Sequence, residues 1–162
     1  MSFLGLGSNL GDRAGNLEAA IGRLRRARGC TLLQVSPIYE TEPVGPVPQG
    51  WFLNAVVACR VQLDPHELLR AAKRIERALG RTPGQRWGPR VVDIDVLLYG
   101  EERISTDDLN VPHPELWNRR FVLAPLLDLL PGGKLAEQVG ERLEVLPERP
   151  AVRLYEGQAT VL

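Results

Sequence analysis

The sequence predicts an α+β fold of the ferredoxin-like type, a βαββαβ sandwich in which an antiparallel sheet carries helices on one face. Apolar patterns follow one another in that order, and no internal repeat interrupts them. The 162 residues, 44% of them hydrophobic, are enough for one core, so we expect a single domain over residues 1–162 with an additional C-terminal helical segment. The other sheet face and its loops are left for a ligand.

Strand and helix patterns alternate through the first half of the chain. An apolar stretch at residues 3–6 predicts a strand, and apolar residues at helical spacing over 17–27 predict a helix. Residues 31–40 form a second strand pattern, in which Pro37 removes a ladder donor and indicates an edge position or a bulge. A loop rich in proline and glycine follows at residues 42–50.

The second half begins with the clearest strand, over residues 53–63, where apolar and other side chains alternate. Asp64 and Glu67 supply the N-cap and N3 residues of a second helix, which ends at Gly80. Residues 91–99 predict another strand. The apolar segment 121–130 predicts a further helix, interrupted near its proline.

Charge and composition restrict the function classes. With 20 Lys+Arg, 20 Asp+Glu and a pI near 6.7, the chain is unsuited to coating nucleic acid or an anionic membrane. No apolar run approaches the ~18 residues that span a bilayer, and the apolar start is too short for a secretory signal, so we expect a cytoplasmic protein. Cys30 and Cys59 form no CxxC motif and are expected in the core.

Asp93 and Asp95 are the strongest chemical signal. The period of a strand places both on one face, with Cα atoms roughly 6.6 Å apart. Two such carboxylates repel by roughly 3 kcal/mol at an effective dielectric near 20, so a cation between them is the economical explanation. Hard oxygen ligands suit Mg²⁺, which shares its remaining positions with water and substrate phosphates. The alternative is a pair of solvated aspartates on an open sheet face.

Arginines lie next to the aspartates. Arg81, Arg86 and Arg90 fall within ten residues around Trp87, and arginine makes planar contacts to phosphate oxygens. The alternative is a loop of surface arginines paired with acidic neighbours. Because the chain contains neither G-x-x-x-x-G-K-[ST] nor G-x-G-x-x-G, a nucleotide must be held in another way.

Several side chains suit a flat heteroaromatic ligand. Phe52 and Asn54 point away from the apolar set of their strand, where an aromatic ring can stack and an amide can both donate and accept. His113 lies between two prolines that stiffen its backbone. The alternative for Phe52 and Phe121 is packing in the core, which is the commoner role of an aromatic residue. The alternative for His113 is a structural role, which is the commoner role of a lone histidine.

The chain also resembles a known family, the 6-hydroxymethyl-7,8-dihydropterin pyrophosphokinases of folate biosynthesis, over about residues 3–130. The matching motifs run in order: Gly7-Ser8-Asn9-Leu10, Ser36 to Thr41, Phe52-Leu53-Asn54-Ala55, the block R-W-G-P-R-V-V-D-I-D from Arg86 to Asp95, and Pro112-His113-Pro114 through Arg119 to Phe121. The block ending in Asp95 is highly specific.

The resemblance implies transfer of pyrophosphate from ATP to the hydroxymethyl group of the pterin, with release of AMP. It implies that Asp93 and Asp95 hold two Mg²⁺ ions and that Arg81 and Arg90 act with them on the phosphates as catalytic residues. ATP contacts carry over to Glu76, Arg81, Trp87, Arg90, His113 and Arg119. Pterin contacts carry over to Thr41, Pro43, Val44, Phe52, Asn54, Trp87 and Phe121. The family precedent favours a monomer acting on small molecules alone.

The sequence departs from the family pattern at residues 82–85, which lack a second arginine after Arg81. Two other classes stay open on the residues alone. A ligand-sensing module would use the same fold without catalysis, and a two-metal phosphohydrolase would also need clustered carboxylates and arginines. An RNA-binding domain is a poor third, because the net charge is zero and the aromatic strand motif is absent.

Overall fold

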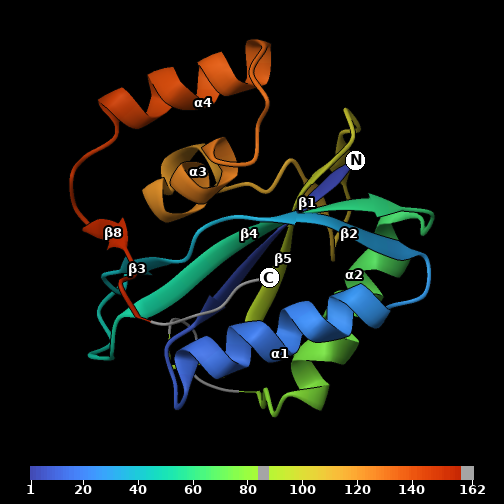
Figure 1. The fold of residues 1–162 in the computed structure, drawn as a ribbon, viewed down its shortest axis with the longest axis horizontal. Coiled ribbons are helices and arrows are strands. Elements are labelled where there is room, and N and C mark those ends of the chain that lie inside the picture. The colour runs from blue at the N-terminus through green and yellow to red at the C-terminus, as the bar shows by residue number, and fades with distance from the viewer. Residues whose placement is uncertain (84–87, 158–162) are drawn as a thin grey trace.

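The structure is a computed structural model, and it describes residues 1–83 and 88–157 (Figure 1). Its elements in order are β1 (Ser2–Ser8), α1 (Arg13–Arg26), β2 (Cys30–Val35), β3 (Tyr39–Thr41), β4 (Phe52–Val61), α2 (Pro65–Ala78), β5 (Asp93–Tyr99), β6 (Ile104–Ser105), β7 (Asn110–Val111), the 3-10 helix η1 (Leu116–Asn118), α3 (Arg120–Leu127), α4 (Lys134–Val145) and β8 (Val152–Leu154). None of the described helices is long and apolar enough to cross a membrane.

The main sheet has the order β5-β1-β4-β3-β8, with β2 also pairing with β4, and its pairings are antiparallel. The mixed α and β composition and the antiparallel sheet are as predicted. The second predicted strand is broken into β2 and β3 around Pro37. At the break, Ser36 replaces the lost ladder bonds: its N–H donates to Val56 O at 2.9 Å, and its hydroxyl accepts from Val56 N at 2.9 Å.

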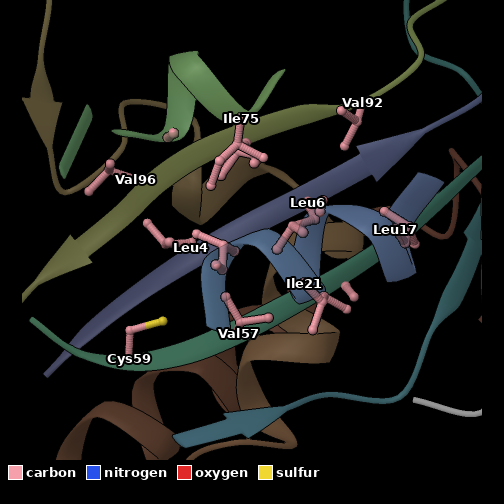
Figure 2. Packing of buried hydrophobic residues seen from close by; sticks show 14 of the residues in the cluster. Leu4, Leu6, Leu17, Ile21, Val57, Cys59, Ile75, Val92 and Val96 are labelled. Atoms are coloured by element: carbon pink, nitrogen blue, oxygen red, sulfur yellow. The ribbon is translucent and has the colours of Figure 1, made fainter. Parts of the chain in front are cut away.

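Helices α1 and α2 cover one face of the sheet, and a buried core fills the space between these helices and the sheet (Figures 1 and 2). Leu4 and Leu6 from β1 and Val57 from β4 point into this core, because side chains alternate along a strand. The predicted capping box is present at the start of α2, where Asp64 and Glu67 each accept from the other's backbone N–H at 2.9 Å.

The opposite sheet face is largely covered, which corrects the expectation that it stays open. α3 and α4 lie over that face (Figure 1), and Phe3, Val56 and Leu97 pack with residues of both helices in a second core. α3 also continues through Pro125, where the sequence predicts an interruption. Burying Leu123 and Leu126 completely stabilises the helix by about 1.5–3 kcal/mol each, enough to offset the ~3 kcal/mol cost of an internal proline.

Candidate active site

A cavity of about 340 Å³ opens on this second face, beside the N-terminal end of α3. Its floor comes from β1, β4 and β5. Its walls come from the loop between β3 and β4, from His113, and from Arg119, Phe121 and Val122. Residues far apart in the sequence therefore meet in one hollow.

The floor is a trough because β1 carries glycine at alternate positions. Gly7 lies between Asp93 on β5 and Asn54 on β4, and Gly5 lies between Asp95 and Val56. A Cβ on Gly7 would come within 2.8 Å of the Asn54 Oδ1 atom, so a larger residue would fill the trough. Sequence reasoning missed both glycines as site residues, although alternate glycines in a strand signal close approach of another group.

Asp93 and Asp95 form one side of the trough. Both line the cavity, while Val92, Ile94 and Val96 enter the core, as the period of a strand predicts. Asp93 accepts from Arg81 Nε at 2.8 Å and from Arg90 Nη1 at 2.6 Å. In the described part of the chain, no ion pair involves Asp95.

Glu76 lies behind this side rather than in the cavity. It is 1% exposed, and its carboxylate accepts from Ile94 N at 2.7 Å and from Lys73 Nζ at 3.0 Å. Arg81 lies 3.7 Å from the same carboxylate and is absent from the cavity lining as well. In this structure Glu76 therefore supports β5, and Arg81 reaches the site through Asp93.

Aromatic and polar side chains form the other side of the trough. Phe52 and Phe121 both line the cavity, together with Thr41, Asn54 and Val44. Asn54 Nδ2 donates to Thr41 Oγ1 at 2.6 Å, which fixes the amide and leaves its oxygen toward the Gly7 floor. Pro43, which was predicted to join this group, is not in the lining.

His113 and Arg119 lie at the boundary between the two sides. Burial is the main cause that lowers the His113 pKa from 6.5, the charge of Arg119 adds to it, and the carboxylates of Asp95 and Glu115 oppose it. His113 Nδ1 accepts from Glu115 N at 3.1 Å, so the neutral ring carries its proton on Nε2. The Arg119 guanidinium lies 5.7 Å from the centre of the Phe121 ring.

Asn9 is a further residue that sequence reasoning did not single out by its chemistry. Its side chain donates to Gln49 Oε1 at 2.8 Å and to Gly50 O at 3.1 Å, and its Oδ1 accepts from Arg90 N at 2.8 Å. Asn9 thus ties the loop on the aromatic side to the segment that carries Arg90. Two predicted residues, Arg86 and Trp87, lie outside the described residues.

Comparison with known proteins identifies the family. Residues 3–131 match the family model described as 7,8-dihydro-6-hydroxymethylpterin-pyrophosphokinase (HPPK). The chain belongs to this family. The HPPK match covers the cavity, both aspartates and both phenylalanines, and it confirms the resemblance drawn from the motifs.

Relatives of known name agree. The chain is 46% identical over 129 residues to 2-amino-4-hydroxy-6-hydroxymethyldihydropteridine pyrophosphokinase of Bacillus subtilis, covering 80% of this chain and 77% of the relative. It is 40% identical to the protein of the same name from Pseudomonas aeruginosa, over 96% of this chain and 93% of the relative. The mitochondrial folate synthesis bifunctional protein of Pisum sativum matches at 47% over 78% of this chain, which spans only 24% of that longer protein.

Solved structures share the fold. A Plasmodium falciparum HPPK-DHPS crystal structure with pteroate superposes with a TM-score of 0.66 at 15% identity, covering 88% of this chain and 42% of that chain. At that identity the likeness extends to the fold alone.

Proposed function

We propose that this HPPK chain transfers the β,γ-pyrophosphoryl group of ATP to the hydroxymethyl oxygen of 6-hydroxymethyl-7,8-dihydropterin, giving the pterin diphosphate and AMP in folate biosynthesis. One observation carries the proposal. A single cavity has two aspartates on one side and two phenylalanines with a fixed amide on the other, separated only by bare glycine backbone. A phosphate chain and a flat ring can therefore lie side by side.

The phosphate side suits Mg²⁺. Asp93 and Asp95 offer hard oxygen ligands, and the described residues hold no cluster of three or more His, Cys, Asp or Glu able to hold a metal. The other ligand positions would fall to nucleotide phosphates and water, and two ions are proposed on the family resemblance. Bound Mg²⁺ would neutralise phosphate charge and polarise the β-phosphorus.

Arg90 and Arg119 line the same cavity and supply fixed positive charge for the nucleotide. Arg81 positions Asp93 through its 2.8 Å hydrogen bond, and Glu76 in turn braces β5. Neutral His113 offers an Nε2–H donor to a phosphate oxygen without adding a proton-transfer step. Trp87 is proposed to contact ATP and pterin on the family resemblance alone.

The ring side supplies stacking and selectivity. Phe52 and Phe121 offer two platforms, and stacking one base-like ring on an aromatic side chain contributes roughly 1–3 kcal/mol. The oxygen atoms of Asn54 and Thr41, with the loop backbone near Pro43 and Val44, face the polar edge of the ring. The hydroxymethyl oxygen then bonds to the β-phosphorus and its proton is released to water, while the bond from that phosphorus to the α-phosphate oxygen breaks and AMP leaves.

We further propose that the chain acts as a monomer in the cytoplasm on small molecules alone. The zero net charge argues against nucleic-acid or membrane partners, and the two buried cysteines are both free thiols, as expected in a reducing compartment. The monomer is proposed on the family resemblance. The solved HPPK-DHPS relatives are larger chains, of which this one spans about two fifths.

Replacing one platform tests the assignment of the ring side. We expect Phe121→Ala to weaken pterin binding about tenfold, the factor for roughly 1.4 kcal/mol of lost stacking, while binding of a non-hydrolysable ATP analogue changes little. Isothermal titration of each ligand in the presence of the other measures both affinities. Equal losses for the two ligands would mean that the residue supports the core and not the ring.

A further inference from the structure

The segment after α4 lies against the loop that joins β3 to β4, residues 42–51. β8 pairs with β3 antiparallel, with Thr41 opposite Val152, and Tyr155 N donates to Ile38 O at 2.9 Å (Figure 1). The flanking residues of the loop, Thr41 and Phe52, face each other across β3 and β4, and both line the cavity. The C-terminal segment therefore borders the ring side directly.

Its first contact with the loop is at Glu42. The N–H of Glu42 donates to Ala151 O at 3.0 Å, and the carboxylate accepts from Ala151 N at 2.7 Å and from the guanidinium of Arg149. The Ala151 N–H is the main cause that lowers the pKa of Glu42, and the charge of Arg149 adds to it. The start of the loop is thus tied to the C-terminal segment by backbone and side chain together.

Its second contact is at Trp51, where the loop ends. The Arg153 guanidinium lies 4.7 Å from the centre of the Trp51 ring, and its Nη2 donates to Glu40 Oε2 at 2.8 Å. Arg13 completes the group, because its Nη1 donates to Glu40 Oε1 and to Trp51 O, both at 2.9 Å. One short segment therefore holds both ends of the loop.

We propose that residues 149–155, the C-terminal clasp, position the loop for ring binding. The loop contributes Glu42, Val44 and Gln49 to the cavity. Without the clasp, Asn9 and Arg13 would still hold its last residues, but its beginning would have to be ordered when the ring enters. Arg149 and Arg153 act as positioning residues that reduce this cost. The inference rests on the proposed function, because it takes the pterin as the ligand beside the loop.

The double variant Arg149→Ala/Arg153→Ala tests the clasp. Both side chains are mostly exposed, at 81% and 66%, so the fold should persist. Loss of two ion pairs and a cation–π contact should raise the KM for the pterin about fivefold while the KM for ATP and kcat stay within about twofold. Arg25→Ala is the matched control, because Arg25 is an exposed residue of α1 on the other face of the sheet. It should change none of these values. An unchanged pterin KM, or an equal rise in both KM values, would overturn the inference.

Two further measurements sharpen the test. Arg153→Lys keeps the charge beside Glu40 but lacks the planar group on Trp51, so its pterin KM should fall between wild type and the double variant. Amide hydrogen exchange at Glu42, whose N–H donates to Ala151 O, should be faster in the double variant than in Arg25→Ala, and equal protection would overturn the clasp. If the wild-type protein makes no AMP, the proposed function fails, and the exchange comparison still decides the clasp.

Discussion

His113 has an environment that its residue type alone does not reveal. It is half-buried beside Asp95 and Arg119, and this partial burial outweighs the carboxylate, so its pKa is lowered from 6.5. A histidine whose pKa is lower folded than unfolded takes up protons less readily when folded. Its contribution to stability is therefore present above pH 6.5 and is lost as the pH falls below that value toward the folded pKa.

An NMR titration of the His113 ring in the free protein tests this environment. The midpoint should lie below 6.5, and Asp95→Asn should lower it further, because the Asp95 charge raises it in the wild type. Asp108→Asn is a suitable control, since Asp108 lies beside His66 and not beside His113. A midpoint at or above 6.5 would contradict the burial of the ring.

At the scale of elements, α3 and α4 support each other through arginine. Arg120, the first residue of α3, donates through Nη2 to Leu143 O and Leu146 O, both at 2.7 Å, at the C-terminal end of α4. Arg142 of α4 in turn donates to Trp117 O at 2.7 Å. The last carbonyls of a helix lack partners within the helix, and Arg120 supplies donors to them. These contacts connect α4 to the segment that presents Arg119 and Phe121.

Removing this cap should destabilise the protein. Arg120→Ala leaves several α4 carbonyls without their donor, so we expect the free energy of unfolding to fall by about 1–3 kcal/mol in urea titrations. The exposed Arg26→Ala at the end of α1 serves as control and should change it by less than about 0.5 kcal/mol. Equal stability of the two variants would show that α4 needs no cap from Arg120.

The elements also show how far the sequence predicts structure. The alternation in β4 and the capping box at Asp64 are local signals, and both elements form as predicted. β8 has three residues and exists through pairing with distant β3, so no local pattern indicates it. α4 was not predicted either; it has one fully buried residue, Val139, because it packs mainly on α3.

Over the whole molecule, the site arises where strands from both halves of the chain meet. The sequence predicted that Asp93 and Asp95 share a face, and the structure brings that face into one cavity with Phe52, Asn54 and Phe121. It could not predict that Glu76 stays behind β5, or that α3 covers part of the sheet and so bounds the cavity. Both depend on packing between distant segments.

Nucleotide product analysis tests the central claim, that one cavity joins pyrophosphoryl transfer to a pterin. With ATP, Mg²⁺ and 6-hydroxymethyl-7,8-dihydropterin, the protein should form AMP and the pterin diphosphate in equal amounts, and EDTA or omission of the pterin should abolish both. Asp95→Asn should fold normally and lose turnover by at least about a hundredfold. ADP formed without pterin, or an unaltered rate in Asp95→Asn, would contradict the account.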